Sequence, residues 1–205
     1  MTLESILKEC PLIAILRGVQ PDECVDIGRA LVDVGIKAVE VPLNSPLPLI
    51  SIAKLKAEFG NDVCVGAGTV MTAAEVSAIS RAGAQFAVSP NSNSMVIRRT
   101  KLVGMVSIPG VATPSEAFAA LADGANALKM FPGEGLPPEV VKAWRAVLPE
   151  TIPLIPVGGV STQNIAAYVR AGASGFGVGS AIYRAGDSAQ QVALAAQEII
   201  RALKR

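Results

Sequence analysis

The stretch VCVGAGTVMTAAEVSAISRAGAQFAVSPN, residues 63–91, contains an apolar run, an amphipathic stretch and a second apolar run. The two runs, VCVG and FAVS, are short, rich in valine and alanine, and followed closely by glycine or proline. Such runs are typical of strands buried on both faces of a parallel sheet. Between them, Thr72 with Glu75 three residues later predicts a capped helix start, and Gly83 predicts the helix end. This stretch therefore predicts one strand–helix–strand unit.

The same alternation extends along the chain. The apolar runs are Leu12–Leu16, Ala38–Val41, Val63–Gly66, Phe86–Ser89, Met105–Ile108, Ala127–Phe131, Leu154–Val157 and Gly175–Val178. They define about eight strand–helix units of roughly 25 residues, a spacing that matches a small parallel barrel. We therefore expect an α/β fold: a (β/α)8 TIM barrel forming a single domain over residues 1–205, with an extra helix at Met1–Glu9. The alternative, an open doubly wound sheet, is disfavoured because no GxGxxG sequence follows the first strand.

The composition limits the chemistry available to this chain. Of its 205 residues, 51% are hydrophobic, and 18 basic side chains nearly balance 17 acidic ones, which argues against disorder and against a nucleic-acid partner. No apolar run reaches the roughly 20 residues of a membrane helix, so no membrane partner is expected. Three widely spaced cysteines indicate a reducing, cytoplasmic location without a zinc site. Because the sequence contains no histidine, imidazole bases and histidine-ligated metals are excluded.

Two charged residues lie inside apolar runs that should be strands. Lys129 stands between leucine and methionine, and Glu40 stands inside AVEV. Side chains alternate between the two faces of a strand. If Lys129 points into the barrel, Ala125 and Ala127 do so too, and Ala38 points inward with Glu40. These small neighbours would leave room for a cavity around both charges.

A lysine and a carboxylate in a water-poor interior either pair with each other or shift their pKa values. A desolvated amine loses its proton more easily, and the neutral amine attacks a ketone to form a Schiff base. A nearby carboxylate can transfer the protons that this reaction requires. The alternative is a purely structural buried ion pair, although buried Lys and Glu are rare without a partner or a function.

Glycines near the ends of the last two predicted strands indicate a phosphate-binding site. Barrels commonly bind phosphate at these two strand ends, through backbone N–H groups. The residues there are Gly158, Gly159, Gly179 and Ser180. Arg17, which ends the first predicted strand, could hold a carboxylate or a phosphate at the barrel mouth. The alternatives are that these glycines only terminate strands and that Arg17 is a solvated strand end.

Seven segments, taken together, resemble one known family. They are AILRG (14–18), VEVPLNSP (39–46), GAGTV (66–70), SPN (89–91), ALKMFP (127–132), PVGGV (156–160) and GVGSAIY (177–183). In this order, and over nearly the whole chain, they resemble the class I aldolases of the KDPG/KHG family. Members of that family are described as (β/α)8 barrels that form trimers and need no metal. The resemblance therefore implies a homotrimer without a cofactor.

The resemblance also implies a role for each site residue. Lys129 would form the Schiff base and Glu40 would be the general acid/base acting through water. Arg17 and Thr69 would bind the carboxylate end of the substrate, Pro90 and Phe131 would line the pocket, and Gly158, Gly159, Gly179 and Ser180 would hold the phosphate. The implied partners are small molecules: a phosphorylated 2-keto-3-deoxy sugar acid, pyruvate and D-glyceraldehyde 3-phosphate.

Two positions bear on which sugar acid is cleaved. The segments VPLNS, with Asn44, and PVGG, with Val157, resemble galactonate-type members of the family, whereas gluconate-type members resemble VTLRT and PTGG. A threonine hydroxyl could hydrogen-bond one C4 configuration, whereas Val157 cannot. We therefore expect cleavage of 2-dehydro-3-deoxy-6-phospho-D-galactonate. The alternatives are the gluconate epimer as substrate, a phosphate-binding barrel enzyme of another class, and a non-catalytic phosphosugar-binding barrel.

Overall fold

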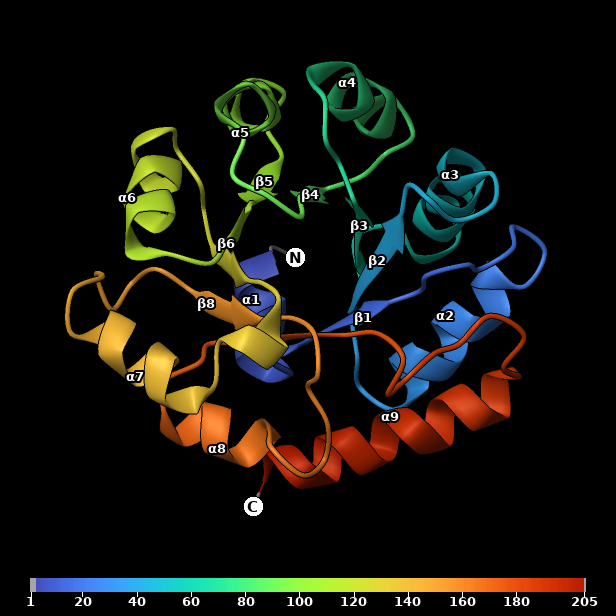
Figure 1. The fold of residues 1–205 in the computed structure, drawn as a ribbon. Coiled ribbons are helices and arrows are strands. Elements are labelled where there is room, and N and C mark those ends of the chain that lie inside the picture. The colour runs from blue at the N-terminus through green and yellow to red at the C-terminus, as the bar shows by residue number, and fades with distance from the viewer. Residues whose placement is uncertain (1–2, 205) are drawn as a thin grey trace.

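The computed structural model describes residues 3–204. The helix expected at Met1–Glu9 is observed as α1, Leu3–Glu9. Its first two expected residues, and Arg205 at the other end of the chain, lie outside the described part. The apolar side chains of α1, Leu3, Ile6 and Leu7, pack with residues of the barrel interior. This extra helix therefore covers one end of the barrel, and Figure 1 shows it near the centre of the ring.

The strands form two parallel sheets that close into one ring. Their bounds are β1 Leu12–Ile15, β2 Ala38–Pro42, β3 Cys64–Gly68, β4 Phe86–Val88, β5 Val106–Ile108, β6 Gly110–Val111, β7 Leu128–Met130, β8 Leu154–Pro156 and β9 Phe176–Val178. The order is β5-β4-β3-β2-β1-β9 in one sheet and β6-β7-β8 in the other. A parallel bridge between Val157 and Gly177 connects β8 to β9. Strands β5 and β6 follow each other directly along the chain and act as one barrel strand.

A proline explains the interruption between β5 and β6. Pro109 has no backbone N–H to donate to a strand ladder, although its carbonyl still accepts a 2.9 Å bond from the N–H of Lys129. With β5 and β6 counted as one strand, the described residues form the predicted eight-stranded barrel. The expected TIM-barrel fold is confirmed.

Helices surround the strands as an outer ring (Figure 1). Their bounds are α2 Cys24–Asp33, α3 Pro48–Phe59, α4 Ala73–Arg81, α5 Ser94–Leu102, α6 Pro114–Ala122, α7 Pro138–Arg145, α8 Ile165–Arg170 and α9 Ala189–Leu203, with a 3₁₀ turn, η1, at Gly133–Gly135. The capping box predicted at Thr72 and Glu75 is present at the start of α4. Gly83, after α4, has the positive φ of 91° that a glycine helix end requires.

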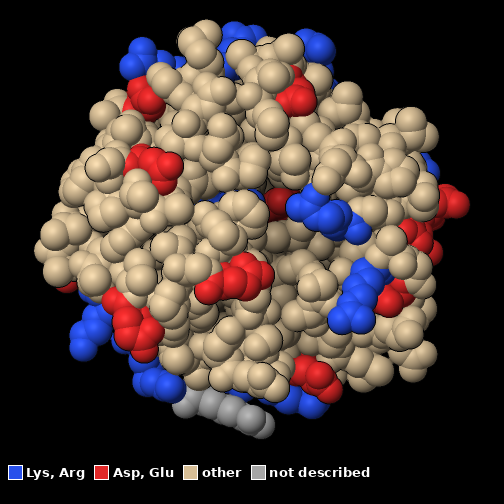
Figure 2. All heavy atoms as spheres, in the orientation of Figure 1, with Lys and Arg blue, Asp and Glu red and all other residues tan. Residues whose placement is uncertain are grey.

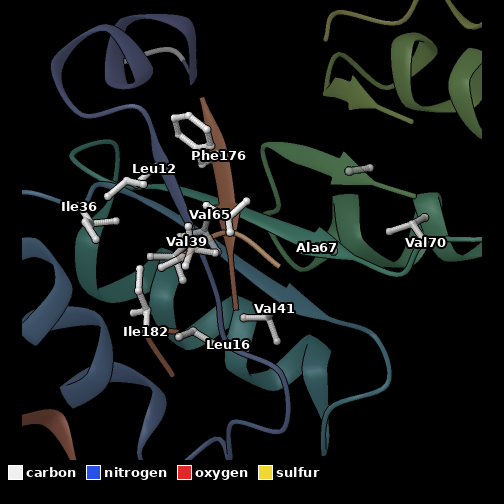
Figure 3. Close-up of a cluster of buried hydrophobic side chains, with 14 of the residues drawn as sticks. Leu12, Leu16, Ile36, Val39, Val41, Val65, Ala67, Val70, Phe176 and Ile182 are labelled. Atoms are coloured by element: carbon white, nitrogen blue, oxygen red, sulfur yellow. The ribbon is translucent and has the colours of Figure 1, made fainter. Parts of the chain in front are cut away.

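The apolar side chains form two layers, as the alternation predicts. The outer layer lies between strands and helices, and Figure 3 shows part of it, including Val39 on β2. Leu128 and Met130 belong to this outer layer, whereas Ala127 packs inside the barrel. The prediction that Ala125 points inward is wrong, because it packs in the outer layer. Its N–H is bonded to the carbonyl of Ala120 at 3.0 Å, so the alternation of β7 has not yet begun there.

Candidate active site

A cavity of about 720 Å³ contains every residue that the sequence predicts for the site. It lies where strands β1, β2, β7, β8 and β9 end in loops, and Figure 2 shows a hollow near the middle of this face. The predicted residues that line it are Arg17, Glu40, Thr69, Pro90, Lys129, Phe131, Val157, Gly158, Gly159, Gly179 and Ser180. The fold therefore brings together positions that are up to 163 residues apart in the chain, from Arg17 to Ser180 (180 − 17).

The two charged strand residues form the floor of this cavity. Glu40 is 3% exposed and Lys129 is 6% exposed. Neither an ion pair nor a hydrogen bond joins them in the described structure, although both face the same space. A proton that passes between them must therefore move through water or through a bound substrate.

Burial shifts the pKa values of both groups toward their neutral forms. It raises the pKa of the Glu40 carboxyl above 4.5, and the positive charges of Lys129 and Arg17 oppose this shift. It lowers the pKa of the Lys129 amine below 10.5; the charge of Glu40 opposes that shift and the charge of Arg17 adds to it. Both shifts favour a neutral amine beside a protonated acid, which is the combination that can attack and protonate a carbonyl group.

Two neighbours fix the positions of these groups. The amine of Lys129 lies 4.3 Å from the centre of the Phe131 ring, in a cation–π contact. Gly68 on β3 leaves the space that the Glu40 carboxylate occupies, since a Cβ atom at this position would overlap Oε1 of Glu40. In the sequence, Gly68 stands out only as part of the segment GAGTV, beyond the predicted strand Val63–Gly66.

The loops after β1 and β2 hold Arg17 at the mouth. Its Nη1 donates a 2.5 Å hydrogen bond to Oδ1 of Asn44. The hydroxyl of Ser45 accepts a 3.0 Å bond from the N–H of Gly18, so the two loops are joined next to Arg17. Thr69, after β3, has a φ of 58°. This left-handed conformation is rare for a β-branched residue and costs on the order of 1–3 kcal/mol, which is typical of functional sites.

The glycine loops present unpaired backbone N–H groups to the cavity. Within the described chain, the N–H groups of Gly159, Val160, Ser180 and Ala181 donate no hydrogen bond to protein atoms. Gly158 and Gly159 have φ values of 100° and 66°, which suit glycine. The side chain of Asn164 donates a 2.8 Å bond to the Gly159 carbonyl and fixes this loop. Such groups form a seat for an anion.

Several cavity residues were not identified from the sequence. They are Ile15, Glu134, Val160, Ser161, Gly177, Ala181, Tyr183 and Arg184. Tyr183 donates a 2.8 Å hydrogen bond to Glu23, which joins the loop after β9 to the loop before α2. Glu134, in η1, and Arg184, in the loop after β9, are both exposed, and no pattern distinguishes them from ordinary surface charges. Only the position of Arg184 four residues beyond Ser180 of the predicted anion site could have indicated its place.

Three further observations concern the chain as described. No helix in residues 3–204 is long and apolar enough to cross a membrane. No group of three or more Cys, Asp or Glu side chains is arranged to hold a metal ion within that range. Cys10, Cys24 and Cys64 are free thiols, and burial raises the pKa of Cys64 to about 11.

Comparison with known proteins identifies the family. The family model for KDPG and KHG aldolases matches residues 3–196. The chain is 46% identical over 194 residues to the 2-dehydro-3-deoxy-6-phosphogalactonate aldolase of Escherichia coli (strain K12), covering 95% of each protein. A solved "Native KDPGal structure" gives a TM-score of 0.93 at 45% identity, covering 96% of this chain and 95% of that one. A KDPG aldolase from Legionella pneumophila, with pyruvate captured as a covalent carbinolamine intermediate, gives 0.83 at 25% identity, covering 99% and 97%. The chain belongs to the KDPG and KHG aldolase family of class I aldolases.

Proposed function

We propose that this aldolase cleaves 2-dehydro-3-deoxy-6-phospho-D-galactonate to pyruvate and D-glyceraldehyde 3-phosphate. One observation supports the chemistry above all others: a buried lysine and a buried glutamate face a single cavity whose other end is a seat for an anion. The substrate supplies a matching series of groups, namely a ketone, hydroxyls and a terminal phosphate. The E. coli relative is named for this substrate.

The reaction begins with the amine of Lys129. In its neutral form, which burial favours, the nitrogen attacks the C2 carbonyl carbon of the keto acid and a carbinolamine forms. Loss of water, with a proton supplied by Glu40 through solvent, converts the carbinolamine to an iminium ion. Arg17 and Thr69 at the mouth hold the substrate carboxylate next to this centre.

Cleavage follows from the positive charge on that nitrogen. Glu40, acting through solvent, removes the proton of the C4 hydroxyl, the C3–C4 bond breaks, and its electron pair moves to form an enamine while the aldehyde leaves. A proton added to C3 regenerates the iminium ion, and water releases pyruvate and the free lysine. The acid/base group returns to its starting state, so no other reactant is required.

Val157 supports the choice of the galactonate epimer. It lies at the end of β8, is 8% exposed and lines the cavity. An apolar side chain offers no hydrogen bond to a C4 hydroxyl, so it gives no advantage to the gluconate configuration. At the position where VTLRT has arginine, this chain has Asn44. Asn44 accepts a hydrogen bond from Arg17 and adds no second cation at the mouth.

The assay is pyruvate release from each C4 epimer, measured by coupling to lactate dehydrogenase. We expect a higher kcat/KM for the galactonate epimer and full activity in EDTA. A preference for the gluconate epimer would assign the alternative substrate. Binding of both epimers without pyruvate release would instead indicate a phosphosugar-binding protein and contradict the proposal.

We also propose that residues 1–205 work as a single domain in a homotrimer in the cytoplasm. The trimer follows from the family resemblance, and the three free thiols suit a reducing compartment. Light scattering coupled to size-exclusion chromatography measures the assembly directly. A monomer at micromolar concentration would contradict the trimer.

A further inference from the structure

Three cations line the cavity, and two of them already have tasks. Lys129 lies on the floor as the proposed nucleophile, and Arg17 is bonded to Asn44 at the mouth. The third, Arg184, forms no ion pair with any carboxylate of the described chain. Its positive charge is therefore available to a ligand in the cavity.

Arg184 belongs to the loop that carries half of the anion seat. The turn after β9 is closed by bonds from the N–H groups of Ile182 and Tyr183 to the Gly179 carbonyl, at 2.8 and 2.9 Å. The Arg184 Nε donates a 3.3 Å bond to the carbonyl of Ser180. Its backbone N–H is held by Asp187 at 2.8 Å. The chain is thus fixed on both sides of Arg184, while the terminal nitrogens of the guanidinium stay free.

A carboxylate lies beside the glycines of the anion seat. Glu134, in η1, also lines the cavity and packs against the glycines of the seat. Its Cγ lies 2.9 Å from the point that a Cβ on Gly159 would occupy. Glu134 is an exposed carboxylate at this end of the cavity, so it repels an anion that binds to the backbone N–H groups. A guanidinium at the same end offsets this repulsion and strengthens the binding of a phosphate.

We propose that Arg184 binds the phosphate of the substrate, together with the backbone N–H groups of the glycine loops. This inference rests on the proposed function, because it assigns one end of the same substrate. The guanidinium donates charge-assisted hydrogen bonds from its terminal nitrogens to phosphate oxygens and offsets the charge of Glu134. In this assignment the reacting carbons bind at Lys129, and Arg184 binds only the phosphate.

The test compares two aldehydes in the reverse reaction, the condensation with pyruvate. One is D-glyceraldehyde 3-phosphate and the other is D-glyceraldehyde, which lacks the phosphate. For Arg184→Gln we expect kcat/KM for the phosphorylated aldehyde to fall about ten- to hundredfold, as for loss of a hydrogen bond to a charged group. The value for D-glyceraldehyde should not change. Arg184→Lys, which keeps the charge, should restore part of the loss, and Glu134→Gln should lower KM for the phosphorylated aldehyde.

Arg170→Gln is the matched control, because Arg170 is an exposed arginine on α8 outside the cavity. It should behave as the wild type with both aldehydes. An unchanged kcat/KM for the phosphorylated aldehyde in Arg184→Gln, or an equal loss with both aldehydes, overturns the role of Arg184. Trapping of pyruvate on the wild-type enzyme by borohydride separates this result from failure of the proposed function. If the wild type traps pyruvate and Arg184→Gln loses nothing, the proposed function stands and only the inference fails.

Discussion

The floor and the rim of the cavity are built in opposite ways. On the floor, Glu40 and Lys129 are charged side chains on central strands, each less than a tenth exposed. At the rim, Gly159 and Ser180 offer backbone N–H groups from loops, and Arg184 is exposed. In the proposed reaction, the buried strands adjust the pKa values of the reacting groups, whereas the exposed loops recognise the phosphate end of the substrate, which does not react.

Removal of the amine from the floor should have the largest effect. Lys129→Met should reduce kcat by more than the roughly 10⁴-fold that a single acid–base group contributes, because no covalent intermediate can form. Circular dichroism and inorganic phosphate binding should stay close to wild type, since the rim is intact. Lys142→Met, which removes an exposed lysine on α7, is the control and should retain activity. Activity of Lys129→Met within tenfold of wild type would contradict the division of roles.

Glu40→Gln tests the second group of the floor. We expect a loss of about 10²–10⁴-fold in kcat, as for removal of a general acid/base. The charge of Glu40 raises the pKa of Lys129, so its removal should lower that pKa further. The rate of pyruvate trapping by borohydride rises with pH as the amine loses its proton. Its midpoint should lie below 10.5 in the wild type and lower still in Glu40→Gln. A midpoint that moves to higher pH would contradict the coupling.

Gly68→Ala disturbs the floor of the cavity without removing a charge. The added methyl overlaps the position of the Glu40 Oε1 atom, so the carboxylate must move. A displacement of about 1 Å at a reacting group costs on the order of 10²-fold in rate. Gly175→Ala is the control, since a Cβ there meets its nearest neighbour at 3.5 Å, an ordinary contact. If both variants are equally active, the position of Glu40 does not limit the reaction.

Val157→Thr should have the smallest effect, because the residue lies between floor and rim and would add only one contact to the substrate. The new hydroxyl can make one neutral hydrogen bond, worth about 0.5–1.5 kcal/mol. We therefore expect the ratio of kcat/KM values for the two C4 epimers to shift toward gluconate by about two- to tenfold. Competition between the epimers in one assay measures the ratio directly. A shift toward galactonate would rule out this explanation of specificity.

The sequence predicted the floor better than the rim, and the reason is physical. A charge inside an apolar strand, such as Lys129 within ALKMF, is costly to bury and therefore conspicuous. The strand alternation then placed Ala127 correctly, and it failed at Ala125 because the strand had not begun. Glu134 and Arg184 escaped prediction because an exposed charge on a loop is ordinary. Only the closure of the ring shows that their loops face the same space.

The barrel itself was predictable because the helix signals and the apolar runs agree with the same fold. The capping box at Thr72 and the glycine end at Gly83 both occur where the sequence predicts them. The start of α8 is less clear from the sequence. Ser161 and Thr162 are residue types that favour a helix start, yet the helix begins only at Ile165. There the side chain of Asn164 accepts a bond from the N–H of Ser161 at 2.9 Å and extends the turn before the helix. Composition and spacing do not show whether a helix or such a turn forms at these residues.

The whole mechanism depends on a covalent bond between the amine of Lys129 and the carbonyl carbon of a keto acid. Incubation of the intact enzyme with pyruvate and sodium borohydride, followed by peptide mass spectrometry, detects this bond. We expect loss of activity in proportion to one reduced pyruvyl group per chain, located on Lys129. Retained activity with Lys129 unmodified, or a tag on another lysine that abolishes activity, would contradict it.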